Sequence, residues 1–210
     1  MGCDGAPGDE LTPPRGLVVA GQCADGDDTV LLIAPDEPDF WRIFTAAPEF
    51  RDGQADPLDR WSKHLIRPWA AQIGGRAVFP SDGPPFAPFI GWALASGRCW
   101  SSPTGMLIHD RMGLFISFRG AVILPQQPAP TMPAAEPPCH DCPRPCLTAC
   151  PVNAFTAEGY DTALCHGWLD RPEGRNCISE GCRVRRACPI SKGCGRLREQ
   201  SAWHMRQFHP

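Results

Sequence analysis

The chain has 210 residues, of which 42% are hydrophobic and 20% charged, so it is long enough to bury a core of its own. Its formal net charge of −3 gives no electrostatic reason to expect nucleic acid as a partner. No apolar run approaches the length of about 20 residues that a membrane helix needs, so we expect no membrane partner. Residues 1–14 lack the charged and apolar regions of a secretory signal and predict a disordered leader. We therefore expect a cytoplasmic protein whose 12 cysteines are not disulfide-bonded.

Residues 15–124 have the pattern of a mixed α/β domain. Short apolar runs bounded by Gly, Asp and Pro predict strands, and apolar residues at spacings of three and four predict helices. Asp56-Pro57 is a typical helix start, and Gly74-Gly75 is a typical end. A turn is expected near 111–113. The predicted strands are 15–20, 29–34, 77–79, 106–108, 114–118 and 121–124, and the predicted helices are 57–73 and 86–96.

The composition changes at residues 125–138, which contain six prolines. Proline blocks both helix and sheet hydrogen bonds, so this stretch predicts an extended, semi-rigid linker. The linker is followed by a cysteine-rich domain at 139–195, and residues 196–210 predict a closing helix.

The cysteine-rich domain contains two runs of three cysteines followed by Cys-Pro. The first run reads C-x2-C-x3-C-x3-C-P, one residue longer than the bacterial ferredoxin run, whose fourth cysteine ligates the other cluster. This exchange of fourth cysteines predicts two [4Fe–4S] clusters. The ligands of one would be Cys139, Cys142, Cys146 and Cys188, and the ligands of the other would be Cys150, Cys165, Cys177 and Cys182.

Two alternatives remain open for these cysteines. Structural zinc also uses C-x2-C pairs, although zinc sites usually combine two self-contained pairs. Cys194 is left over, either as a free thiol or as a replacement for Cys182 or Cys188.

The C-terminal part resembles the double-cubane domain of epoxyqueuosine reductase and the reductive dehalogenases. Cys150–Ala154, CPVNA, is similar to their CPTGA, and Leu164-Cys165 is similar to their separate RC ligand, whereas the spacing from Cys177 to Cys188 departs from theirs. Residues 105–125 and the DPLDR of 56–60 resemble the cobalamin-processing proteins of cblC type. The resemblance implies a flavin-reductase- or nitroreductase-like α/β domain that holds a corrinoid, followed by a small ferredoxin-like domain with two clusters.

The same resemblance implies roles for four further residues. His109 and Arg111 would border the corrinoid, and Arg119 would pair either with a corrinoid carboxamide or with a carboxylate of the chain. Asp82 would be a catalytic proton donor, or else a member of an ordinary Ser-Asp-Gly-Pro turn.

Three functions follow as hypotheses. The first is an oxidoreductase that passes single electrons from two clusters to a corrinoid, for corrinoid processing or a corrinoid-dependent reduction. It would need an external low-potential electron donor and a corrinoid or small-molecule substrate. The second is a ferredoxin-type electron carrier without a corrinoid, whose α/β part docks partners or binds a flavin. The third is a non-catalytic metal-binding or chaperone module.

Overall fold

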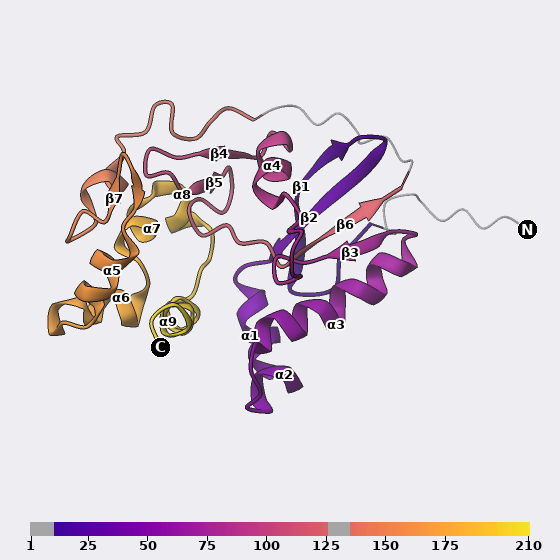
Figure 1. Cartoon of the computed structure of the whole chain (residues 1–210), viewed down its shortest axis with the longest axis horizontal. Coiled ribbons are helices and arrows are strands. Elements are labelled where there is room, and N and C mark those ends of the chain that lie inside the picture. The colour runs from indigo at the N-terminus through magenta and orange to yellow at the C-terminus, as the bar shows by residue number, and fades with distance from the viewer. Residues whose placement is uncertain (1–10, 126–134) are drawn as a thin grey trace, which may run out of the picture. The chain divides into compact units, whose positions relative to one another are not determined.

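The computed structural model describes residues 11–125 and 135–210 (Figure 1). The predictions of a leader and of a proline-rich linker fall mainly outside the described residues. The described chain divides into two compact units: residues 11–98 with 117–125, and residues 99–116 with 135–210. Residues 99–116 thus belong with the cysteine-rich segment, although in sequence they precede the linker. No helix in the described ranges is long and apolar enough to cross a membrane.

The first unit contains a four-stranded antiparallel sheet in the order β1-β2-β6-β3 (Figure 1). The strands are β1 (Leu17–Asp25), β2 (Asp28–Pro35), β6 (Gly120–Leu124) and β3 (Arg76–Val78). A two-residue turn joins β1 to β2, and Gly26 in this turn has the positive φ of 61° that such hairpins require. The prediction of a mixed α/β domain is confirmed at this level.

Both faces of this sheet are covered. Side chains alternate between the two faces along a strand, yet β6 is buried at every residue and β2 at every residue after Asp28. The helix α3 (Pro57–Gln72) contacts β3 and β6, and α4 (Phe89–Ala95) contacts β1 and β2. These two helices, which lie close to their predicted positions, cover much of the sheet.

The helix α3 begins at Pro57 as predicted, but Asp56 has left-handed backbone geometry and makes no capping hydrogen bond. Two helices that sequence patterns did not predict, α1 (Asp39–Ala46) and α2 (Pro48–Arg51), pack beside it. The Phe44 ring lies 5.6 Å from that of Trp61 on α3. With four residues α2 is too short to show an apolar repeat, whereas α1 buries Phe40 and Phe44 at the helical spacing of four, a signal that the sequence contains and that was missed.

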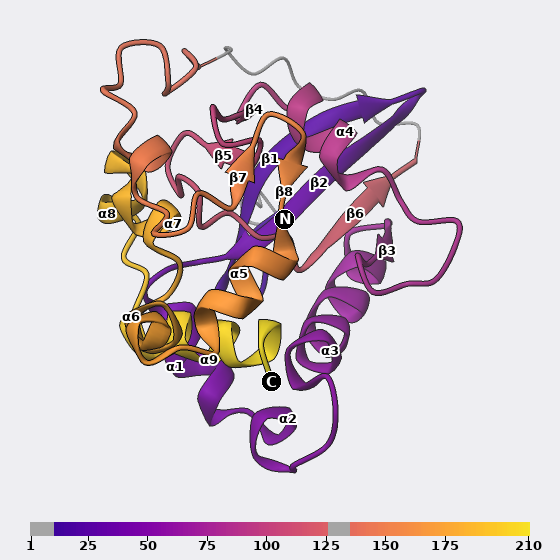
Figure 2. The same ribbon diagram turned by 60° about the vertical axis from the view of Figure 1, so that its left-hand side comes forward.

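The second unit is mostly helical and carries two small hairpins (Figure 2). One hairpin pairs β4 (Cys99–Ser101) with β5 (Leu107–His109), and the other pairs β7 (Phe155–Thr156) with β8 (Gly159–Tyr160). Its helical elements are η1 (Pro145–Thr148), α5 (Thr162–Leu169), η2 (Pro172–Gly174), α6 (Arg175–Glu180), α7 (Arg183–Ala187), α8 (Pro189–Gly193) and the closing helix α9 (Arg198–Phe208). The prediction of a helix near the C-terminus is confirmed.

The strand predicted at 114–118 is wrong, because these residues form a turn and irregular structure. The Leu114 N–H donates to Ser191 Oγ at 2.9 Å, and the Leu114 carbonyl accepts a hydrogen bond from Arg185. Both backbone groups are therefore engaged by the cysteine-rich segment and are not available to a sheet. Gly113, with a φ of 58°, packs so closely on Ser191 that a Cβ there would collide with its backbone.

Candidate functional site

The structure brings eight cysteines together in two sets of four. We call Cys139, Cys142, Cys146 and Cys188 the first cysteine group. We call Cys150, Cys165, Cys177 and Cys182 the second cysteine group. Within each group, negative charge on one thiol raises the pKa of another, so the sulfur atoms lie close in space. The assignment of each set to one cluster stays a prediction.

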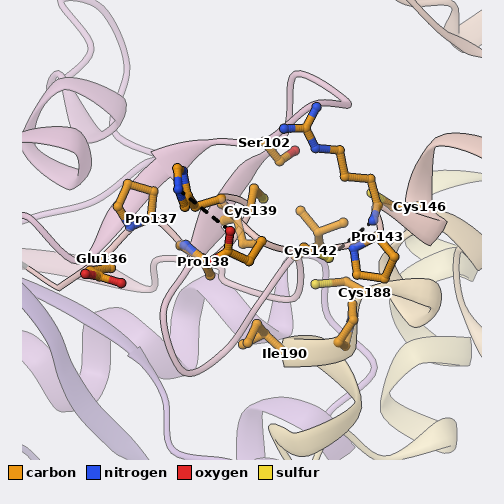
Figure 3. Close-up of a pocket in the computed structure, with 16 residues that line it drawn as sticks. Ser102, Glu136, Pro137, Pro138, Cys139, Cys142, Pro143, Cys146, Cys188 and Ile190 are labelled. Carbon is orange, nitrogen blue, oxygen red and sulfur yellow. Dashed lines mark hydrogen bonds and ion pairs between the residues drawn. The ribbon is translucent and has the colours of Figure 1, made fainter.

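The first cysteine group surrounds a cavity of about 360 Å³ (Figure 3). Cys139 and Cys142 lie on the loop before η1, Cys146 lies within η1, and Cys188 lies between α7 and α8. The rest of the wall is largely apolar and comes from β5, the following turn, the loop before η1 and α8; it includes Ile108, Leu114, Pro137, Pro138, Pro143, Pro189 and Ile190. Cys146 and Cys188 are buried in one cluster with Ile108, Leu114 and Val184. Polar side chains complete the lining, namely Ser102, Glu136, His140, Asp141 and Arg144, so the cavity presents four sulfur atoms within a wall of mixed polarity.

Burial raises the pKa of the Cys139 thiol, and negative charge on its three partners in the group raises it further. Burial likewise raises the pKa of Cys146, where Cys188 adds the next largest contribution. The backbone N–H of Arg144 donates to Cys142 Sγ at 3.4 Å. Four thiols so placed repel one another once ionised, and a bound metal cation would relieve that repulsion.

The second cysteine group is assembled from four separate elements. Cys150 follows η1, and its Sγ accepts the N–H of Ala154 at 3.3 Å. Cys165 lies in α5, which begins where the Asp161 carboxylate accepts the N–H of Leu164 at 2.8 Å. Cys177 lies in α6, and Cys182 lies directly before α7. Short helices therefore hold the last three sulfur atoms in place.

Polar groups surround the second cysteine group. Burial raises the pKa of the Cys165 thiol, whereas a hydrogen bond from the Tyr160 hydroxyl acts in the opposite sense. Burial also raises the pKa of Cys177, and the backbone N–H and the charge of Arg183 oppose this rise, with a smaller contribution from the Trp168 indole N–H. That indole nitrogen is buried and has no hydrogen bond of ordinary geometry within the described residues. Tyr160 itself has a raised pKa, because of burial and then because of its bond to Cys165.

Arg185 is a third polar group near the second cysteine group. Burial of its guanidinium lowers its pKa, whereas negative charge on Cys182 raises it. Sequence reasoning missed Arg185, Tyr160 and Trp168. The arginines between Cys182 and Cys188 are visible in the sequence, but nothing there shows which one turns inward. No local pattern marks the tyrosine or the tryptophan.

His109 and Arg111 belong to the second unit. His109 is buried, and its Nδ1 accepts the backbone N–H groups of Arg111 at 3.1 Å and Met112 at 3.2 Å, which holds the turn after β5. Asp110 Oδ1 also lies 3.1 Å from this nitrogen. Because two backbone N–H groups already donate to the lone pair of Nδ1, these backbone bonds determine how the ring is held. Arg111 is exposed. A role for either residue beside a corrinoid stays a prediction.

Asp82 and Arg119 belong to the first unit. Asp82 Oδ2 accepts the backbone N–H of Phe79 at 2.9 Å, and its Oδ1 lies 3.2 Å from Lys63 Nζ. Its carboxylate therefore takes part in a turn after β3 and in an ion pair. Arg119 Nη1 lies 4.0 Å from a carboxylate oxygen of Asp59. The proton-donor role of Asp82 and the corrinoid role of Arg119 stay predictions.

Cys194 ends α8, where its backbone N–H donates to the Ser191 carbonyl. Whether it is a surplus thiol or a ligand stays a prediction. In the described ranges, no three His, Cys, Asp or Glu side chains converge closely enough to share one metal ion. Ligands of a [4Fe–4S] cluster need not converge in this way, because each thiolate binds a different iron atom.

The residues present fit two iron–sulfur clusters. Each group supplies the four thiols that such a cluster takes as ligands, and their environments favour the binding of a cation over free thiolates. The buried indole N–H of Trp168 beside Cys177 is the kind of donor that sulfur ligands of a cluster accept.

Comparisons with protein-family models, with curated proteins and with solved structures found no match to this chain.

Proposed function

We propose that this chain is an iron–sulfur redox protein in which the first and second cysteine groups each hold one [4Fe–4S] cluster. The observation that carries the proposal is the sorting of eight cysteines into two groups, with Cys150 and Cys188 exchanged between the runs. Zinc sites usually combine two self-contained cysteine pairs, which differs from this exchange. We also propose the finer fold assignment, in which a flavin-reductase-like domain is followed by a ferredoxin-like domain.

The chain's own residues would position the ligands and shield them. Pro151 and Pro189 turn the backbone directly after the exchanged cysteines. The backbone N–H groups of Arg144 and Ala154 orient Cys142 and Cys150 through N–H···S hydrogen bonds. When bound, a [4Fe–4S] cluster accepts and releases single electrons, and the apolar wall around the first cysteine group would limit the access of water to it.

We further propose that the electrons pass to a corrinoid, which the chain would reduce or process as an oxidoreductase. The support is the resemblance of residues 105–125 to cobalamin-processing proteins. Residues 105–116 of that stretch lie in the same unit as the cysteines, and the hydrogen bonds of Leu114 attach them to α7 and α8.

The second candidate is a ferredoxin-type electron carrier without a corrinoid. The engagement of His109 Nδ1 and of the Leu114 backbone within the fold favours it, because these groups already have partners within the chain.

The cluster proposal is tested by iron and sulfide analysis of anaerobically purified protein. We expect about eight of each per chain, from four irons in each cluster. Cys150→Ser should lose about half of the iron, and Cys194→Ser is the control that should lose none. One zinc per chain without acid-labile sulfide would refute the proposal.

The corrinoid proposal is tested by titrating cob(III)alamin into the reduced protein and recording the absorption spectrum. We expect conversion to cob(II)alamin faster than with an equal concentration of a free ferredoxin, because the transfer would take place within one complex. Asp82→Asn should leave this electron transfer unchanged and slow only a later step that needs a proton. If the titration causes no spectral change, the corrinoid proposal is refuted and the electron carrier remains as the candidate function.

A further inference from the structure

The helix α9 carries no cysteine, yet it contacts elements that hold three of the four cysteines of the second cysteine group. It packs beside α6, which contains Cys177 (Figure 2). Gly181 ends α6 and comes directly before Cys182. A Cβ at Gly181 would lie 2.8 Å from the Cβ of Ser201 on α9, which is closer than two carbon atoms can approach. The start of α9 is therefore held tightly against the segment that leads to Cys182.

The third cysteine, Cys165, lies on a helix with little packing of its own. The helix α5 has eight residues, and Leu169 is the only one of them that is buried. A helix this short is marginal in water unless tertiary contacts stabilise it. The position of Cys165 therefore depends on contacts that other elements make with α5.

His209, at the end of α9, makes two of these contacts. Its Nδ1 lies 2.6 Å from the Nδ1 of His166, the residue after Cys165, and its Nε2 lies 3.1 Å from the Asp170 carboxylate at the end of α5. With both rings neutral, His166 donates to His209 and His209 donates to Asp170, which satisfies both contacts. Only 22% of the His209 side chain is exposed, so water competes little for them.

Phe208 adds a stack of rings that reaches the second cysteine group. Its ring lies 4.6 Å from the His166 ring and 6.4 Å from the Tyr160 ring, at interplanar angles of 27° and 24°. Tyr160 also stacks on Phe155, at 4.6 Å and 7°, and its hydroxyl donates to the sulfur of Cys165. Because the Tyr160 ring lies between two phenylalanine rings, its hydroxyl is held at this sulfur atom.

These contacts involve the second cysteine group and not the first. In the described residues, every hydrogen bond, ion pair and ring contact of the Phe208 and His209 side chains is with α5 or with Tyr160. The cysteines of the first group lie on other elements, namely the loop before η1, η1 and the residue between α7 and α8. Loss of the contacts at the end of α9 should therefore act on the second group.

We propose that Phe208 and His209 form a latch that holds α5 and Tyr160 against the second cluster and protects that cluster from water and from iron chelators. The inference rests on the proposed function. Both are positioning residues, since they act through α5 and Tyr160 and supply no ligand. When the latch is open, α5 keeps little packing, so Cys165 leaves its iron atom more readily.

The test is the rate at which anaerobic, dithionite-reduced protein releases iron to bathophenanthroline disulfonate, a chelator of ferrous iron, as measured by absorption. Each variant is made in two full-length backgrounds. Cys188→Ser keeps only the second centre, and Cys182→Ser keeps only the first. His209→Ala and Phe208→Ala should each accelerate release about tenfold in the first background, because the lost contact lowers the free energy of local opening. Neither should change the rate in the second background.

Gln207→Ala is the matched control, since Gln207 is exposed in the same turn of α9 and its loss should leave both rates unchanged. Two conservative variants test the assigned roles. Phe208→Tyr keeps the stacked ring, and His209→Gln keeps a donor for Asp170, so each should restore most of the protection. Rescue of this kind distinguishes the latch from a general loss of packing at the helix end.

Equal release from the His209→Ala and Gln207→Ala proteins in the Cys188→Ser background would overturn the inference, as would equal acceleration in both backgrounds. Iron content is measured on every sample before release. A wild-type protein without clusters refutes the proposed function, whereas full clusters with unchanged release refute only the latch. If His209→Ala fails to fold, Phe208→Ala decides the outcome alone, because it leaves the histidine pair in place.

Discussion

The two cysteine groups offer the same four-thiol donor set in different surroundings. The first faces side chains of Ile108, Leu114 and Ile190, together with several prolines. The second lies among hydrogen-bond donors, namely the Tyr160 hydroxyl, the Trp168 indole and the backbone N–H of Arg183. The sulfur ligands determine what is bound, whereas the surroundings determine how well it is shielded and how readily it takes an electron. Changes to the wall should therefore affect mainly the persistence of the first centre, and changes to the donors mainly the potential of the second.

The largest effect should come from removing one ligand of each group, at the two ends of α7. Cys182→Ser and Cys188→Ser should each remove about half of the iron, because each removes a ligand of a different cluster. The double variant should therefore lose nearly all of it, as measured by iron analysis and the visible absorption of the clusters. A double variant that retains half of the iron would show that both cysteines serve one cluster and would break the comparison.

Gly113→Ala should damage the wall of the first group. Gly113 has a positive φ, and a Cβ there would collide with Ser191, so strain and overpacking together should cost about 2–5 kcal/mol. We expect a lower melting temperature and faster bleaching of the first centre in air, with the second centre less affected. Gly167→Ala is the control, because a Cβ at that exposed helical position meets no other atom. Equal bleaching of both centres would contradict the assignment of this turn to the first group.

A smaller effect is expected from Ser191→Ala, which leaves the buried N–H of Leu114 without its acceptor. An unsatisfied buried donor costs about 1–3 kcal/mol, which corresponds to about 2–4 °C of melting temperature for each kcal/mol in a chain of this size. Calorimetry of the cluster-loaded protein measures the change. The matched control is Ser179→Ala in α6, since Ser179 is exposed and its loss should be nearly neutral. Equal melting temperatures for the two variants would show that the Leu114 contact contributes little.

The smallest effect should come from Trp168→Phe, which removes the indole N–H beside Cys177 and keeps an aromatic ring. We expect a small decrease in the reduction potential of the second centre, since a donor to a cluster sulfur atom favours the reduced state but a dipole acts more weakly than a full charge. The first centre in the same sample is the internal control. A shift in the reduction potential of the first centre instead would show that the Trp168 indole N–H acts on the first cysteine group.

The sequence predicted the α/β character of the first unit, because that character depends on local patterns, whereas the assignment of the cysteines to two clusters stays a prediction. Apolar runs of strand length and the order of cysteines around Cys-Pro are visible without knowledge of the fold. The strand expected at 114–118 fails because distant residues, Ser191 and Arg185, take the hydrogen bonds of Leu114. The donors around the second group could not be predicted for the same reason, since only packing determines which side chains lie beside the sulfur atoms.

The order of the ligands along the chain has a consequence for assembly. All four cysteines of the second group fall between Cys146 and Cys188, so the first centre closes a loop that contains the second. The entropic cost of closing a loop rises with the logarithm of its length, and a cross-link inside the loop shortens the segment that remains free. The inner centre should therefore form first and lower the cost of closing the outer one. Loss of the second centre should accordingly make the first release its iron to a chelator more readily, whereas the second should depend less on the first.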